Sequence, residues 1–262
     1  MIIILFIIIM NIIYCLVLLL IFIFLFRKKK TNLVIKKKFP QLGLIRQEGN
    51  VLILGTGNKG LIILLAASKE VVLNNEEGYY QSIGPYVKDY TIVTYDLPHH
   101  KKVTGGHSEV KDRPLEIWGT DPTVLEKNNL LLNDIIKKYK IPGKPVILSG
   151  ISRGGYLSSM YPNADYYFLF SPVINLRKLK EYKNATFPEV DQYVDENSFT
   201  GKKLFIYINS DDTRVGGDWI IKHMTDVVGV NKNGKNYKMI TGKGGHPTPR
   251  DIFKKAVKYF SL

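Results

Sequence analysis

The chain has 262 residues, with 37 Lys and Arg against 23 Asp and Glu, and a formal net charge of +14 at neutral pH. Its single cysteine, Cys15, excludes an internal disulfide and a zinc site built on cysteines, and the sequence contains no H-E-x-x-H or EF-hand spacing. We therefore expect no metal and no other cofactor, while the basic balance leaves nucleic acid and an anionic membrane surface as possible partners.

The amino-terminal segment differs from the rest of the chain in its hydrophobicity. Residues 2–26 carry no charge, and a helix of that length exceeds the roughly 30 Å hydrocarbon core of a bilayer. A cleaved signal peptide is the alternative, but it requires a basic start, a shorter apolar core and small residues at the cleavage site. The sequence lacks these features, so we expect residues 1–26 to form a permanent transmembrane anchor.

A basic linker, residues 27–49, follows the apolar segment. Eight Lys or Arg residues lie between positions 27 and 46, and the first acidic residue is Glu48. The positive-inside rule places the remainder of the chain on the cytoplasmic side, and the basic cluster can contact anionic lipid. More than half of the net charge is gathered here, and no base-stacking motif or recognition helix is evident, so we do not expect nucleic acid as a partner.

The remaining residues, 50–262, have the length of one domain and alternate between apolar strand-like runs and helical patterns. This alternation predicts an α/β fold with a doubly wound, mostly parallel sheet. About six core strands are expected at 51–54, 91–98, 146–148, 166–170, 203–208 and 237–240, and helices at 61–72, 121–139, 176–182 and 252–260. The runs at 33–35 and 42–45 are short and interrupted by lysine, so the sheet is expected to be truncated at that edge.

The most informative motif is the pentapeptide Gly150-Ile151-Ser152-Arg153-Gly154, which follows the apolar run 146–148. The pattern G-x-S-x-G is typical of a nucleophile elbow, a sharp turn from strand to helix that exposes a serine hydroxyl above the sheet. Glycines are needed two positions before and after the serine because neighbouring backbone passes too close for a Cβ atom.

An acid and a base follow this serine in the order that a nucleophile elbow requires. Asp211 and Asp212 come directly after the apolar run 203–208, and His246 lies in a glycine-rich loop after 237–240. The other histidines are less suitable: three precede the serine, and one lies in an amphipathic stretch, where we expect it on a helix surface or packed within the fold. These are His99, His100, His107 and His223.

Together these segments resemble the α/β-hydrolase superfamily. The acid of that family commonly lies in an Asp-x-x-Val turn, which Asp212 and Val215 match, and its histidine in a Gly-Gly-His loop, which residues 244–246 match. The resemblance spans about residues 50–262. The spacing favours Asp212 over Asp211 as the acid.

The resemblance implies a catalytic triad of Ser152, Asp212 and His246. It also implies an oxyanion hole formed by the backbone N–H of Arg153 and one N–H from the loop at Thr56 or Gly57. The expected protein is a membrane-anchored serine hydrolase that cleaves an ester, thioester or related acyl bond of a small-molecule or lipid-like substrate through an acyl-enzyme on Ser152.

Two other functions stay open: a catalytically silent hydrolase-fold protein that binds a partner, and a small serine peptidase. About 29 residues, 174–202, separate the strand after the elbow from the strand before Asp212, which leaves room for only a small cap or none. The longer loop at 98–120 is a candidate rim for the pocket.

Overall fold

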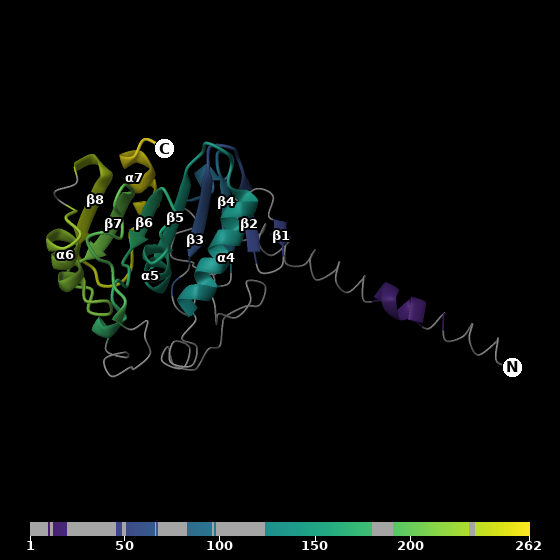
Figure 1. Ribbon diagram of the computed structural model, residues 1–262, viewed down its shortest axis with the longest axis horizontal. Helices are drawn as coiled ribbons and strands as arrows, with labels where there is room; N and C mark the ends of the chain where they lie inside the picture. Colours follow the sequence, from purple (N-terminus) through teal and green to yellow (C-terminus); the bar gives the residue numbers. More distant parts are fainter. Residues whose placement is uncertain are drawn as a thin grey trace.

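The structure, a computed structural model, describes residues 10, 13–19, 46–48, 51–65, 67, 83–95, 97, 124–179, 191–230 and 234–262. These residues build one eight-stranded sheet in the order β1-β2-β4-β3-β5-β6-β7-β8 (Figure 1). The strands are β1 (Arg46–Glu48), β2 (Val51–Thr56), β3 (Leu61–Leu65), β4 (Thr91–Tyr95), β5 (Val146–Ile151), β6 (Tyr166–Phe170), β7 (Lys203–Asn209) and β8 (Tyr237–Gly242). From β4 to β8 in this order neighbouring strands are parallel, whereas β2 is antiparallel to both β1 and β4.

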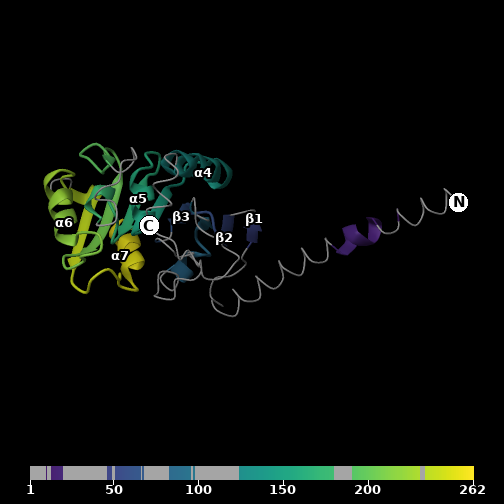
Figure 2. The same cartoon turned by 90° about the horizontal axis from the view of Figure 1, so that it is seen from below.

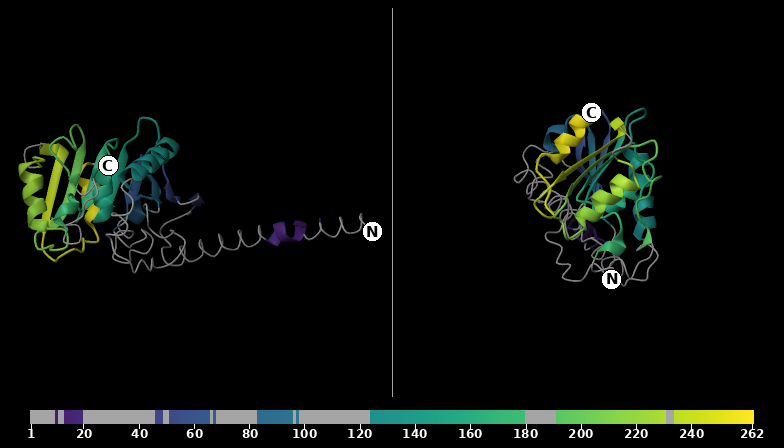
Figure 3. Two further views of the ribbon diagram at one scale, coloured as in Figure 1. Left: turned by 60° about the horizontal axis from the view of Figure 1, so that its bottom comes forward. Right: turned by 90° about the vertical axis from the view of Figure 1, so that its left-hand side faces the viewer.

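Helices cover both faces of the sheet. Figure 2 shows α4 (Val124–Tyr139), α5 (Arg153–Ser159) and α6 (Gly217–Asp226) on one face and α7 (Ile252–Tyr259) on the other. The same division is visible along the sheet in the right-hand view of Figure 3. A sheet that is buried on both faces needs nearly continuous apolar strands, and every residue of β3 and β5 is buried. The predicted doubly wound α/β architecture is therefore confirmed.

The sheet has two more strands than the sequence predicted. Residues 61–65 were expected to begin a helix, but they form β3 between β4 and β5. The side chains of Leu61, Ile63 and Leu65 enter the core beneath α4, α5 and α6, whereas Ile62 and Leu64 enter the core beneath α7. Because both faces are buried, the run is apolar throughout and too short to reveal its period of two.

The expectation of a truncated sheet edge is also wrong. The edge is completed by β1, a three-residue strand at 46–48 that pairs with β2. A third correction concerns the helix expected at 176–182, of which the structure describes residues 176–179. The chain forms a single 3-10 turn, η4 (Leu176–Lys178), and is extended again at Leu179, with φ −77° and ψ 136°.

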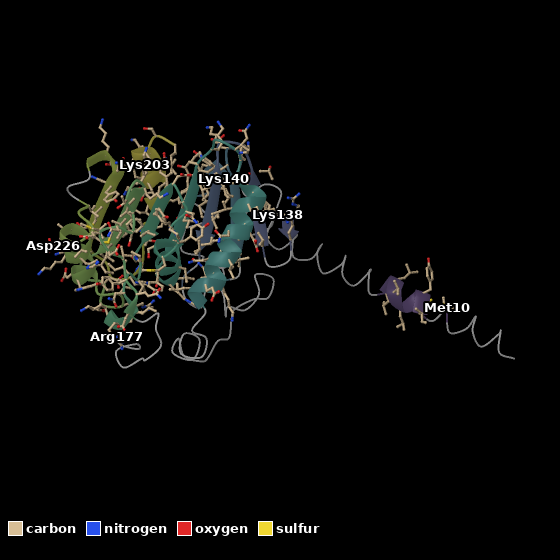
Figure 4. The ribbon with its side chains drawn as sticks, in the orientation of Figure 1. Met10, Lys138, Lys140, Arg177, Lys203 and Asp226 are labelled. Atoms are coloured by element: carbon tan, nitrogen blue, oxygen red, sulfur yellow. The ribbon has the colours of Figure 1, made fainter. Side chains whose placement is uncertain are left out.

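The strands β5 to β8 end together at one edge of the sheet, which is the lower edge in Figure 1. Ile151 pairs with Phe170, Phe170 with Tyr207, and Asn209 with Gly242. Figure 4 locates the two edges: Lys140 and Lys203 lie at the edge where β5 and β7 begin, and Arg177 lies at the opposite edge, beyond the end of β6. Ligand sites of open α/β sheets lie at the carboxyl ends of the strands.

Only part of the amino-terminal segment belongs to the described residues. Residues 13–19 are helical, and their apolar side chains are about half exposed, from 48% for Val17 to 64% for Tyr14. Within the described part of the chain, no helix combines the length and the apolar character that crossing a membrane requires. Most of the predicted anchor (1–26) and linker (27–49), and the whole loop 98–120, lie outside the described residues.

Candidate active site

Ser152 lies at a sharp turn between β5 and α5. Its backbone has φ 52° and ψ −113°, a combination that is strained for a residue with a side chain. The turn is held by two backbone hydrogen bonds, from Ser152 N to the Phe170 carbonyl (3.1 Å) and from Val173 N to the Ser152 carbonyl (3.0 Å). A Cβ on Gly150 would lie 2.2 Å from the carbonyl oxygen of Gly154, which explains the first glycine of the motif. Ser152 therefore has the backbone geometry of a nucleophile elbow.

The side chains of Asp212 and His246 form a close pair, with Nδ1 of the histidine 2.8 Å from Oδ2 of the aspartate. The Asp212 side chain is fully buried, and its other oxygen, Oδ1, accepts hydrogen bonds from the backbone N–H groups of Arg214 (3.0 Å) and Val215 (3.4 Å). An ionised carboxylate accepts a hydrogen bond from Nδ1–H, and in the neutral ring this leaves Nε2 with a free lone pair. The pair thus presents a base of defined tautomer.

The sheet brings these residues to the same edge. Ser152 follows β5, Asp212 follows β7 and His246 follows β8, and these strands end in register through β6. No hydrogen bond joins the Ser152 hydroxyl to the His246 ring among the described residues. Catalytic hydrogen bonds are often long in unliganded enzymes and shorten only when substrate binds.

The neighbouring aspartate, Asp211, contacts the backbone of the histidine loop and not the imidazole ring. Asp211 is exposed and accepts hydrogen bonds from the backbone N–H groups of Gly244 (2.9 Å) and Gly245 (3.0 Å), which directly precede His246. These bonds to Gly245 and Gly244 lower the pKa of the Asp211 carboxyl. The side chain that pairs with the histidine ring is that of Asp212, as the Asp-x-x-Val spacing predicted.

Only one of the predicted oxyanion-hole elements lies at the nucleophile's edge. Arg153 is the first residue of α5, and a first-turn backbone N–H has no acceptor within its own helix. Thr56, in contrast, pairs with Thr91, the first residue of β4, because β2 runs antiparallel to β4. The N–H of Gly57 donates to the Tyr90 carbonyl (3.1 Å). Thr56 and Gly57 thus lie at the opposite edge, and their assignment to the oxyanion hole is wrong.

The end of β3, and not the end of β2, lies beside the nucleophile elbow. Leu65, the last residue of β3, pairs with Gly150, two residues before the nucleophile. Leu65 therefore lies at the edge of the sheet where Ser152 follows β5. The sequence pattern did not reveal the place of this strand, because residues 61–72 were expected to form a helix. The available signal was the close repetition of apolar runs at 51–54 and 61–65, separated by a glycine-containing turn.

The remaining histidine that the structure describes has a packing role. His223 lies on α6, with Nε2 2.6 Å from the Val194 carbonyl and its ring stacked on Trp219 at 4.9 Å. His99, His100 and His107 lie outside the described residues. Across the residues that the structure describes, no cluster of three or more His, Cys, Asp or Glu side chains could hold a metal ion.

Comparison with known proteins identifies the fold. No protein-family model and no curated protein matches the sequence. Among solved structures, TT1662 from Thermus thermophilus superposes with a TM-score of 0.60 at 17% identity, covering 84% of this chain and 99% of that protein. The Pyrococcus furiosus esterase Pf2001 gives a TM-score of 0.55 at 16% identity, covering 80% and 83%. The acetyl xylan esterase of Paenibacillus sp. R4 gives 0.52 at 11% identity, covering 88% and 93%.

These similarities and the sheet order show that the chain has the α/β-hydrolase fold. In this fold the described residues place a strained serine turn, a buried carboxylate and a histidine after the carboxyl ends of parallel strands.

Proposed function

We propose that the protein is a serine hydrolase that cleaves an ester, thioester or related acyl bond through an acyl-enzyme on Ser152. The observation that carries this proposal is the 2.8 Å pair between His246 and the buried Asp212, at the same sheet edge as a strained serine. A domain that only binds a partner gains nothing from a histidine of fixed tautomer beside a serine elbow.

In the proposed reaction, the Ser152 Oγ attacks the acyl carbonyl while His246 Nε2 removes its proton. Asp212 stabilises the imidazolium that forms. The tetrahedral oxyanion accepts a hydrogen bond from the backbone N–H of Arg153. His246 returns the proton to the leaving group, and the acyl group stays on Ser152. Water, activated by His246, then hydrolyses the acyl-enzyme and restores the serine.

The proposal includes attachment to a membrane, with the hydrolase domain on the cytoplasmic side. Its support comes from the sequence: residues 2–26 are uncharged and are followed by eight Lys or Arg residues before position 47. A site held beside a bilayer suits acyl substrates that partition into lipid. The anchor and the chemistry are independent parts of the proposal, because none of the triad residues lies in the anchor.

Labelling of the full-length protein with a fluorophosphonate tests the chemistry, since this probe reacts with an activated serine whatever the natural substrate. We expect wild-type protein to be labelled and to hydrolyse p-nitrophenyl acetate, and Ser152→Ala to lose both while keeping its melting temperature. Ser198→Ala, in a turn at 195–198 away from the triad, is the matched control and keeps both properties. A folded Ser152→Ala protein with wild-type turnover would refute the assignment, and an unlabelled wild type would favour a silent binding domain.

A further inference from the structure

The histidine loop, residues 242–247, is held by every residue of one tetrapeptide at the end of β7. This tetrapeptide is Asn209-Ser210-Asp211-Asp212. Asp212 contacts the imidazole ring, whereas the other three contact the backbone of the loop. Ser210 N donates to the Gly242 carbonyl (3.0 Å), which continues the pairing of β7 with β8 past the last strand residue. The two contacts that remain, from Asp211 and Asn209, have no part in the reaction described above.

Asp211 binds the amino-terminal side of the histidine. Its Oδ1 accepts from Gly244 N (2.9 Å) and Gly245 N (3.0 Å), and its Oδ2 lies 3.0 Å from Gly244 N. Hydrogen bonds from backbone N–H groups to an ionised carboxylate are roughly twice as strong as neutral ones. They fix the direction in which the chain enters His246.

Asn209 binds the backbone on both sides of the histidine. Its Nδ2 donates to the carbonyl of Gly245 (2.7 Å) and to the carbonyl of Pro247 (3.0 Å). Its Oδ1 accepts a hydrogen bond from the Tyr207 hydroxyl (2.6 Å), so the amide can present its NH₂ group to the loop in only one orientation. Asn209 is 1% exposed, so its two hydrogen bonds to the loop are buried within the protein.

The loop requires such hydrogen bonds because its two glycines contribute no side-chain packing that would hold the backbone in place. Gly244 and Gly245 have φ 130° and 73°, and a Cβ at either position would contact nothing within 4 Å. Glycines in open space bury no apolar side chain and lose the most conformational entropy when they are fixed. A displacement of about 1 Å in a catalytic group can lower the rate roughly a hundredfold.

We propose that Asp211 and Asn209 are positioning residues for His246, which hold the backbone of its loop so that the imidazole stays paired with Asp212 and reaches Ser152. The inference rests on the proposed hydrolase function and adds two residues that touch neither substrate nor the imidazole ring. The two adjacent aspartates then have different roles: Asp212 orients the imidazole ring, and Asp211 orients the backbone of the loop that carries His246.

The test compares Asp211→Ala and Asp211→Asn with Asp89→Ala in the full-length protein. Asp89 is the matched control, because it is an exposed carboxylate that pairs with Lys59 at the opposite edge of the sheet. We expect Asp211→Ala to slow fluorophosphonate labelling and to lower kcat for p-nitrophenyl acetate by about 10- to 100-fold, with KM unchanged. Asp211→Asn keeps an Oδ1 acceptor and should retain most of the rate, and Asp89→Ala should match wild type.

Hydrogen–deuterium exchange of the peptide containing residues 243–247 gives a readout that does not depend on catalysis. In Asp211→Ala we expect faster exchange at Gly244 and Gly245, with wild-type protection elsewhere and a single cooperative unfolding transition. If wild-type protein is not labelled, the hydrolase proposal fails, and the exchange data alone decide whether Asp211 orders the loop. Wild-type labelling by Asp211→Ala, or a slowing that comes with a general loss of protection, would overturn the positioning role.

Asn209→Ala tests the buried hydrogen bonds to the loop. We expect fluorophosphonate labelling to slow by about 10- to 100-fold and exchange at the same peptide to become faster. If this variant does not fold, Tyr207→Phe replaces it, because it keeps the aromatic ring and removes only the hydroxyl that orients the Asn209 amide. Its expected slowing is about two- to tenfold. Labelling at the wild-type rate in a folded Asn209→Ala protein, or in Tyr207→Phe where that variant replaces it, would remove Asn209 from the proposal.

Discussion

Two glycine-rich segments lie at the ends of strands in this sheet, and they differ in the packing and the backbone conformation of their glycines. The first, residues 55–57, comprises the last two residues of β2 and the residue after them, and the second, the histidine loop at 242–247, begins with the last residue of β8. In the first loop, a Cβ on Gly57 would lie 2.1 Å from the backbone carbon of Asp89, so glycine is required by close packing. In the second, Gly244 and Gly245 lie in open space with positive φ, so glycine is required by backbone conformation.

The comparison shows that a glycine-rich segment after a strand does not by itself indicate a catalytic loop. Because β2 runs antiparallel to β4, its loop emerges where the parallel strands begin. The loop after β8 emerges where they end, together with Ser152 and Asp212. Strand direction, and not the glycine content, decides which loop can take part in the proposed chemistry.

The largest expected difference between the two loops is in turnover. His246→Gln removes the base and should lower kcat by about 10⁵-fold or more. Thr56→Val, in the loop at the other edge, should stay within about twofold of wild type, since neither acyl group nor oxyanion comes near it. The measurement is p-nitrophenyl acetate hydrolysis by both folded variants. A comparable loss of kcat in Thr56→Val would show that this loop takes part in the reaction.

Alanine substitutions of the loop glycines should separate stability from activity. Gly57→Ala places a methyl group against the backbone of Asp89 and should lower the free energy of unfolding by about 1–3 kcal/mol, with normal turnover per folded molecule. Gly245→Ala meets no atom, but it must adopt φ 73°, at about 1–2 kcal/mol, and should reduce turnover by moving His246. Chemical denaturation and kcat, measured on both variants, check this prediction. Equal effects on activity would contradict the distinction between the loops.

The smallest expected effect concerns the pH dependence of the Asp211 contact. The bonds from Gly245 and Gly244 lower the pKa of this carboxyl, so the folded-state pKa lies below the unfolded value of about 4. Stabilisation by the carboxylate is therefore complete above about pH 4 and is lost as the pH falls through the folded-state pKa.

We thus expect the difference in melting temperature between wild type and Asp211→Asn to be constant from about pH 8 to pH 5 and to shrink as the pH falls further. Thermal unfolding of both proteins across this range is the measurement. A difference that persists at the acidic end would mean that the charge of Asp211 has no part in holding the loop.

The sequence alone determined the class of fold and the order of the site residues. Strands buried on both faces must be apolar along their whole length, so β5, β6 and β7 are visible as continuous runs. The serine motif and the Asp-x-x-Val turn are local: their requirements, a close backbone approach at Gly150 and backbone N–H groups that bind Asp212, lie within a few residues. Local requirements of this kind leave a pattern in the sequence.

Tertiary structure decided what depends on the pairing of distant segments. The sequence does not show that β2 is antiparallel, so it could not exclude Thr56 and Gly57 from the oxyanion hole. The run at 61–65 is too short for its own pattern to distinguish strand from helix, and only its position between β4 and β5 makes it a strand. The contacts of Asn209 and Asp211 with the histidine loop span more than thirty residues of chain. Such contacts form because β7 and β8 are neighbours, which a local pattern in the sequence does not record.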